Sequence, residues 1–130
     1  MNDTPKSILY LEDDEDTRRP LTWILEREGY TVYPFSTAWE SLESIREGLR
    51  YDLALLDLTM PDRNMPNEDV DDVIRESKNR NPSVHIITFS GWPDTTGEYK
   101  RKGVHAHYNK GEGRDKTSKL LELIAQHLKR

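Results

Sequence analysis

Five short apolar segments recur along the chain, and longer stretches with apolar residues three and four positions apart separate them. The five segments are 7–12, 30–35, 51–57, 83–89 and 103–109. Runs such as LALL and IITF are apolar at nearly every position, which is typical of strands covered on both faces. Repeated strand–helix units with short connections form parallel sheets through right-handed crossovers. The pattern therefore predicts an α/β fold with a doubly wound parallel five-stranded sheet.

The stretches between the strands have the spacing of amphipathic helices. Helices are expected at 16–28, 37–48, 67–79 and 115–129, with a weaker fourth segment around 95–98. Thr37 and Glu40 have the spacing of a capping box, and Gly48 stands where the second helix should end. The units together predict a flavodoxin-like (βα)5 fold with strand order 2-1-3-4-5. In such a sheet, sites form at the carboxyl ends of the strands, where the strand order reverses.

The composition excludes several classes of protein. The chain has 130 residues, the length of one domain, and no cysteine, which excludes a thiolate nucleophile, a disulfide framework and a Cys-bearing zinc site. Its 24 acidic and 19 basic residues give a net charge of −5, which argues against nucleic-acid binding. No secretory signal is recognisable, and no segment approaches the ~20 apolar residues of a membrane span. We therefore expect a cytoplasmic protein with no membrane or nucleic-acid partner.

Acidic residues follow the first and third strand-like runs. Glu12 and Asp13 come directly after the first run, and Asp57 ends LALLD, the most apolar run of all. Glu15 and Asp16 are better explained as a solvated first helical turn. In the expected order the first and third strands are neighbours, so Asp57 would face Glu12 and Asp13. Clustered carboxylates repel one another and need a divalent cation, for which Mg²⁺ is suited.

Two further polar residues end strands at the same edge of the sheet. Ser90 follows the fourth run and Lys110 the fifth, and each alone would be an ordinary loop residue. Together they bring a hydroxyl donor and a fixed positive charge to the edge that carries Asp57. A carboxylate nucleophile, a cation and donors that neutralise oxygen charge are the components of phosphoryl transfer. The combination therefore predicts a phosphoryl-transfer site.

Four motifs surround these residues: ILYLEDDED, LALLDLTMPD, IITFSG and YNKG. With them the chain resembles the receiver domain of two-component response regulators along essentially its whole length. The resemblance implies that Asp57 is the phospho-acceptor and that Glu12 and Asp13 help to bind Mg²⁺, with Mn²⁺ as an alternative. It also implies that the backbone carbonyl of Thr59 is a metal ligand.

The resemblance gives roles to the remaining polar residues and to the partners. Ser90 would be the hydroxyl that follows the phosphoryl group, and Lys110 the lysine of the site. A sensor histidine kinase or phosphotransfer protein would supply the phosphoryl group. A downstream protein effector would read a change at the face of the fourth helix, fifth strand and fifth helix. Such a chain is not an enzyme beyond its own phosphorylation and slow autodephosphorylation, and we expect 1–130 to be a single receiver domain without an output domain, like the chemotaxis regulator.

Three positions depart from the pattern of the family. Gly111 follows Lys110 where the family has a proline, and His107 stands where an aromatic residue changes rotamer on activation. Trp92 lies two positions beyond Ser90, where family members tune the access of hydrolytic water. We therefore expect His107 and Trp92 to alter the switching and the lifetime of the phosphorylated form.

Two alternative functions stay open from sequence. A degenerate receiver would bind partners without being phosphorylated. The missing proline at Gly111, the altered loop RNMPNED and His107 favour it, whereas retention of the acids, Ser90 and Lys110 argues against it. An aspartyl-phosphate hydrolase would need a second acid where this chain has Thr59. Nucleotide-binding glycine motifs are absent.

The three other histidines are not expected to bind a metal, and two of them are expected to be structural. His85 and His105 lie in strand-like runs, and His127 is expected to face solvent on the last helix.

Overall fold

The computed structural model describes residues 5–58, 70–90, 103–109 and 116–128, and five parallel strands form one sheet within these ranges. The strands are β1 (Ser7–Leu11), β2 (Thr31–Phe35), β3 (Leu53–Asp57), β4 (His85–Ser90) and β5 (Ala106–Asn109). Their order is β2-β1-β3-β4-β5, and every pairing of neighbours is parallel. The predicted flavodoxin-like order is therefore confirmed.

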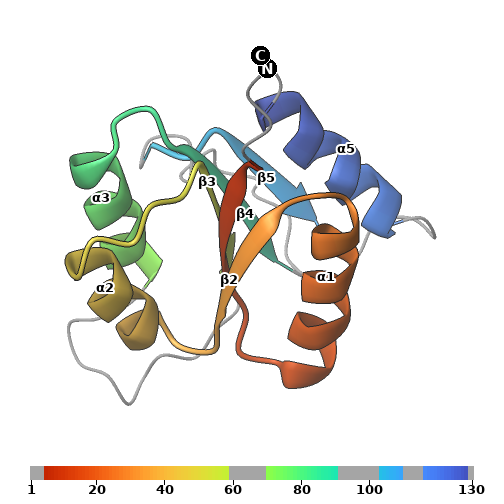
Figure 1. Cartoon of the computed structure of the whole chain (residues 1–130), viewed down its shortest axis with the longest axis horizontal. Coiled ribbons are helices and arrows are strands. Elements are labelled where there is room, and N and C mark those ends of the chain that lie inside the picture. Colours follow the sequence, from red (N-terminus) through yellow and green to blue (C-terminus); the bar gives the residue numbers. More distant parts are fainter. Residues whose placement is uncertain (1–4, 59–69, 91–102, 110–115, 129–130) are drawn as a thin grey trace.

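Helices cover both faces of the sheet. They are α1 (Glu15–Arg27), α2 (Ala38–Arg46), α3 (Val70–Arg80) and α5 (Lys116–Leu128). Figure 1 shows α2 and α3 on one face and α1 and α5 on the other. The fourth helical segment, expected around 95–98, lies outside the described residues. In the described part of the chain, no helix is both long and apolar enough to cross a bilayer.

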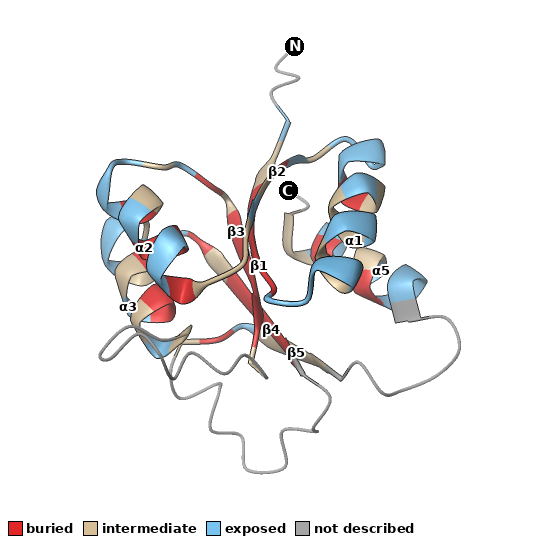
Figure 2. Cartoon of the chain, turned by 90° about the horizontal axis from the view of Figure 1, so that it is seen from below, coloured by how far each residue is buried: buried red, intermediate tan, exposed pale blue. Residues whose placement is uncertain are grey.

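The strand β3 lies in the middle of the core. Its residues alternate between two buried clusters, with Ala54 and Leu56 in the cluster under α2 and α3 and Leu53 and Leu55 in the other. All four side chains are fully buried, and Figure 2 shows the buried residues gathered along the strands. Each buried leucine contributes about 1.5–3 kcal/mol of transfer free energy. Burial on both faces explains why the run LALL has no polar position.

The ends of α2 follow from the residues at its boundaries. Thr37 precedes the helix, and its Oγ1 accepts a hydrogen bond from the N–H of Glu40 at 3.1 Å. At the other end Gly48 has a φ of 103°, a conformation that glycine adopts without strain. The N–H of Gly48 donates to the carbonyl of Ile45, and that of Leu49 to the carbonyl of Ser44. The expected cap and stop are therefore confirmed.

Backbone hydrogen bonds continue the sheet beyond the carboxyl ends of β1 and β3. The N–H of Glu12 donates to the carbonyl of Phe35 at 3.0 Å, and the N–H of Leu58 donates to that of Phe89 at 2.8 Å. Glu12 donates one of these bonds, and Asp57 directly precedes Leu58, which donates the other. The sheet therefore fixes the backbone positions of both acids. This edge is where the acidic residues meet.

Candidate functional site

Glu12 and Asp57 are carboxylates buried at the carboxyl edge of the sheet. Asp57 is the last residue of β3, and Glu12 directly follows β1, the neighbouring strand. Each residue is only 1% exposed. Charged carboxylates are rarely buried unless they are paired, hydrogen-bonded or bound to a metal, since removing them from water costs several kcal/mol. Burial of both at one edge therefore makes Glu12 and Asp57 candidate site residues.

Asp13 adds an exposed carboxylate to this pair. Oxygen atoms of Glu12, Asp13 and Asp57 all lie within 4.8 Å of one another. The proximity inferred from the expected strand order is therefore found. Mg²⁺ takes oxygen ligands at about 2.0–2.1 Å and is commonly held by one or two carboxylates with waters and a phosphate oxygen. The carboxylates fit such an ion, and Asp13 provides the solvent-facing side.

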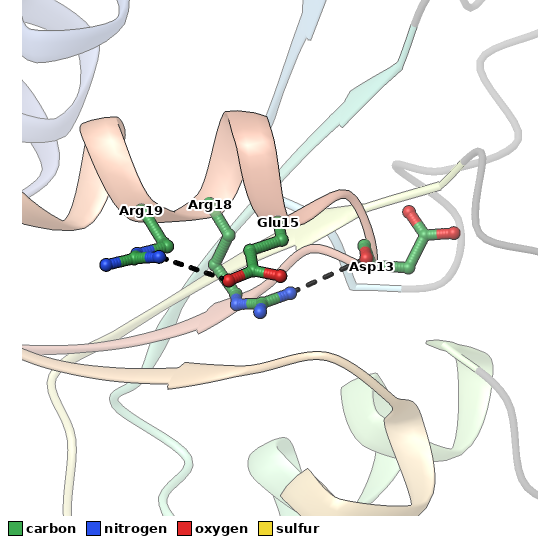
Figure 3. A network of polar contacts seen from close by, with 4 residues as sticks. All are labelled: Asp13, Glu15, Arg18 and Arg19. Carbon is green, nitrogen blue, oxygen red and sulfur yellow. Dashed lines mark hydrogen bonds and ion pairs between the residues drawn. The ribbon is translucent and has the colours of Figure 1, made fainter.

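Arg18 holds the segment that follows β1 (Figure 3). Its guanidinium group donates to the backbone carbonyl of Glu12 at 2.9 Å and to that of Asp13 at 3.5 Å. These bonds engage main-chain oxygens rather than the carboxylates, and one carboxylate oxygen of Glu12 accepts a hydrogen bond from the N–H of Asp14 at 3.3 Å. Glu15 pairs instead with Arg19 at 3.2 Å, and both are largely exposed. Glu15 therefore belongs to a solvated helical turn, as expected.

Tyr10 lies under the acidic cluster with a buried hydroxyl group. The residue is 0% exposed, and its hydroxyl has no hydrogen-bond partner among the residues that the structure describes. Its ring is 6.2 Å from that of Phe89. Burial raises the pKa of the Tyr10 hydroxyl above its ordinary value, and the negative charges of Glu12 and Asp57 raise it further. The hydroxyl therefore stays protonated and neutral beside the carboxylates.

Thr88 is a buried hydroxyl residue that the sequence analysis missed. It is 0% exposed, and its Oγ1 lies 2.7 Å from Nδ1 of His107 on β5. Thr88 pairs with Leu56 across the β3–β4 ladder, one position before the pairing of Asp57 with Phe89. The motif IITFS contains two hydroxyl residues, Thr88 and Ser90, and the family resemblance points only to the second. The register of β4 against β3 is the signal that could have identified Thr88.

Several expected site residues lie at the limit of the described structure or beyond it. Ser90 is the last residue of β4, as the sequence predicted, and it pairs with Asn109 through the backbone. The remaining positions, Thr59, Trp92, Lys110 and Gly111, lie outside the described residues.

The expectation for His127 was wrong. This residue does not simply face solvent, because its Nδ1 lies 3.2 Å from Nδ1 of His85 at the start of β4. His105 adds a third ring, with its centroid 5.0 Å from that of His85. The three histidines come from β4, from the residue before β5 and from α5, and they gather at the amino end of β4. This cluster lies away from the carboxyl edge that holds Asp57.

The comparison with protein families agrees with this fold and site. The family model for the response regulator receiver domain matches residues 8–122. The chain therefore belongs to the response regulator receiver domain family, whose members are signalling modules of two-component systems.

Three curated relatives are similar to this chain. The chain is 28% identical over 89 residues to the sensor kinase CckA of Brucella abortus, and 31% identical over 108 residues to the cell cycle transcriptional regulator CtrA of Caulobacter vibrioides. These matches span 9% of CckA and 44% of CtrA, so the chain corresponds to only part of each. The receiver protein CpdR of Brucella abortus is 32% identical over 87 residues, which are 67% of this chain and 68% of CpdR.

Solved structures show the same fold. A CheY-like receiver domain protein from Methanospirillum hungatei has a TM-score of 0.78 and 26% identity, over 95% of this chain and 93% of its own. The response regulator TrrA of Thermotoga maritima, solved in complex with Mg²⁺ and BeF, has a TM-score of 0.75 and 22% identity, over 95% and 99% of the two chains.

Proposed function

We propose that this receiver domain is a phospho-acceptor that takes a phosphoryl group on Asp57 in a Mg²⁺-dependent reaction. The observation that carries the proposal is the cluster of Glu12, Asp13 and Asp57, whose oxygen atoms lie within 4.8 Å of one another at the carboxyl edge of the sheet. A buried acid at the end of a central strand is held in one position, and a fixed nucleophile lowers the entropic part of the barrier. Membership of the receiver family supports this reading.

The transfer step is a substitution at phosphorus. An oxygen of the Asp57 carboxylate attacks the phosphorus of a phosphohistidine on a partner, or of a small phosphodonor, and forms a new O–P bond. The P–N or P–O bond to the donor breaks, and the leaving group keeps the electron pair. The product is an acyl phosphate on Asp57. The hydroxyl of Tyr10 remains protonated nearby and adds no further charge to the site.

Glu12, Asp13 and Asp57 would hold the Mg²⁺, with the backbone carbonyl of Thr59 as a further ligand. When bound, the ion neutralises negative charge on the carboxylates and on the transferring phosphoryl oxygens. Asp13 is the exposed member of the three, so it faces the side from which a donor arrives. Lys110 would add a fixed positive charge. Arg18 keeps the Glu12–Asp13 segment in place through its bonds to the two carbonyls.

A switch would connect the phosphorylated site to β5. The new charge on Asp57 attracts a hydroxyl from the end of β4. The family resemblance implies that this hydroxyl belongs to Ser90. Thr88 is a second candidate, because it is buried one register position from Asp57 and bonded to His107. Movement of either hydroxyl would shift the loop after β4 and the side chain of His107, which changes the face of the fourth helix, β5 and α5. Trp92 would tune the lifetime of the acyl phosphate by limiting water.

The partners we propose are a sensor histidine kinase or phosphotransfer protein upstream and a protein effector downstream, in the cytoplasm. The similarity to a sensor kinase and to a cell cycle regulator supports a place in such a pathway. The chain then acts as a signal carrier, and its catalysis is limited to its own phosphorylation and slow dephosphorylation.

The test uses beryllofluoride, which mimics the acyl phosphate. We expect ¹⁹F NMR to detect a bound species only when Mg²⁺ is present, and we expect Asp57→Asn to lose it. Asp16→Asn is the control, because Asp16 is an exposed acid in the first turn of α1. Absence of the bound species from the unaltered protein would refute the proposal and favour the phosphorylation-independent interaction module.

A further inference from the structure

Two imidazole rings from distant parts of the chain meet at the amino end of the sheet. His85 is the first residue of β4, and His127 is in the last turn of α5. Their Nδ1 atoms are 3.2 Å apart, and both side chains are partly buried. Each Nδ1 has either one proton or one lone pair to offer. Two protonated or two unprotonated Nδ1 atoms would repel each other at this distance. The two nitrogens must therefore share one proton or one cation.

His105, the third histidine of the cluster, is hydrogen-bonded to the backbone of Ile86. Nδ1 of His105 accepts the N–H of Ile86 at 2.9 Å, and the N–H of His105 donates to the carbonyl of Ile86 at 2.8 Å. In the neutral ring the proton is therefore on Nε2. A metal at Nε2 would move the proton to Nδ1 and break the bond to Ile86. His105 is accordingly a structural neighbour and not a ligand.

The distance between His85 and His127 matches a pair of ligands on one ion. Two nitrogens bound to an ion at about 2.1 Å lie about 3.0 Å apart in octahedral and about 3.4 Å apart in tetrahedral geometry. The observed 3.2 Å lies between these values. A shared metal ion and a shared proton therefore require nearly the same distance between the two Nδ1 atoms.

A polar pocket adjoins the pair and offers room for an ion with its waters. It is lined by Lys6, Asp52, Asn81, Ser83, His85, His127 and Leu128. The Asp52 carboxylate accepts hydrogen bonds from the backbone N–H and the hydroxyl of Ser7, which fixes it at the pocket wall. Its negative charge offsets the positive charge of Lys6 on the same wall.

We propose that His85 and His127 form a two-imidazole site for a borderline divalent cation, Zn²⁺ or Ni²⁺, completed by water. The ion would link the start of β4 to the C-terminal end of α5. Imidazole nitrogen favours such ions, whereas Mg²⁺ favours oxygen, so the two ends of the sheet select different metals. The site is independent of the acidic cluster, because His85 begins β4 whereas Asp57 pairs with Phe89 near the end of that strand.

The test is calorimetric titration of Ni²⁺ into the metal-free protein at neutral pH, without an affinity tag and with saturating Mg²⁺ to occupy the acidic cluster. We expect one saturable site. His127→Gln and His85→Gln should each weaken it at least about ten-fold, as removal of a metal-binding partner commonly does. His105→Gln should leave the affinity within about three-fold. No saturable binding, or equal binding by both His85→Gln and His127→Gln, would overturn the proposal.

A second measurement needs no variant. Paramagnetic Ni²⁺ should broaden the imidazole NMR signals of His85 and His127 before those of His107, which is bonded to Thr88 elsewhere on the sheet. If the first signals to broaden are those of residues around Asp57, the ion binds the acidic cluster and the proposed site does not exist.

Discussion

Oγ1 of Thr88 and Nδ1 of His107 lie 2.7 Å apart, which joins β4 to β5 through a fully buried hydroxyl group. The two residues are also register partners in the β4–β5 ladder. Phe89, the next residue along β4, is the register partner of Asp57. This side-chain hydrogen bond adds to the backbone ladder that joins β4, the strand beside the acidic cluster, to β5, the strand of the proposed effector face.

Breaking this hydrogen bond should destabilise the fold in a non-additive way. We expect Thr88→Val and His107→Phe each to lower the free energy of unfolding by about 1 kcal/mol, because each leaves a partly or fully buried polar atom without its partner. The double variant should lose less than the sum, with a coupling of roughly 0.5–1.5 kcal/mol. Urea unfolding of the four proteins measures this coupling. Strict additivity would show that the bond contributes nothing in solution.

Removing the buried hydroxyl of Tyr10 should stabilise the protein. That hydroxyl is buried and finds no hydrogen-bond partner within the described part of the chain, and an unsatisfied buried hydroxyl costs about 1–3 kcal/mol. Tyr10→Phe keeps the ring and its contact with Phe89, so the midpoint of urea unfolding should rise. The matched control is Tyr51→Phe, which should lower the midpoint because the Tyr51 hydroxyl is bonded to Ser77. A decrease for Tyr10→Phe would mean that the hydroxyl has a partner in solution.

Neutralising Asp57 should stabilise the metal-free protein and reduce its response to Mg²⁺. Asp57→Asn removes repulsion between carboxylates with oxygens within 4.8 Å, worth about 3–4 kcal/mol for each pair of charges at an effective dielectric constant of about 20 and less after screening by solvent. Thermal unfolding with chelator and with Mg²⁺ measures both effects. The unaltered protein should gain more stability from Mg²⁺ than Asp57→Asn does. Equal gains in the two proteins would place the ion elsewhere, and Asp16→Asn controls for the change in net charge.

Stability should fall as the metal-free protein is acidified through the range in which histidine titrates. Burial and the positive charge of Lys78 lower the pKa of His105, and burial and His85 lower the pKa of His127. The unfolded chain therefore binds more protons than the folded chain just below the ordinary pKa of about 6.5. The contribution of these groups is complete above that pH and is lost as the pH falls toward their lowered values.

Urea unfolding from about pH 8 to about pH 5 in the presence of a chelator measures this dependence. His127→Gln should flatten the profile below about pH 6.5, since one titrating ring is gone. Identical slopes for the two proteins would show that His127 titrates alike when folded and unfolded. Protonation at Nδ1 of His105 also breaks the hydrogen bond that it accepts from the N–H of Ile86. This loss also lowers the free energy of unfolding at acidic pH.

The central position of the third strand and the placement of the acids at its carboxyl edge could be predicted from features that are local in sequence, whereas the full strand order was expected from the flavodoxin-like fold class. A run that is apolar at every position, such as LALL, must be covered on both faces, and this places β3 in the centre. An acid at the end of such a run has to lie at the carboxyl edge. The neighbouring positions of β1 and β3 then bring Glu12 and Asp57 together, which the structure confirms.

Thr88 and His127 could not be predicted in the same way. Thr88 and Ser90 both lie near the end of β4, and only the pairing of Leu56 with Thr88 shows which of the two hydroxyl residues lies beside the last apolar residue of β3. For His127, the helical periodicity of the sequence predicts on which face of α5 the residue lies. It does not predict the angle at which α5 crosses the sheet. That crossing brings its last turn to His85, and it depends on packing between residues 42 positions apart.

The most direct test of the central claim is the intact mass of the protein after incubation with a small phosphodonor and Mg²⁺. We predict the addition of one phosphoryl group to the unaltered protein, its absence with chelator and its absence in Asp57→Asn. Hydroxylamine should remove the added mass, because it cleaves acyl phosphates. An unchanged mass under all conditions, or a phosphoryl group that persists in Asp57→Asn, would contradict the claim that Asp57 is the phospho-acceptor.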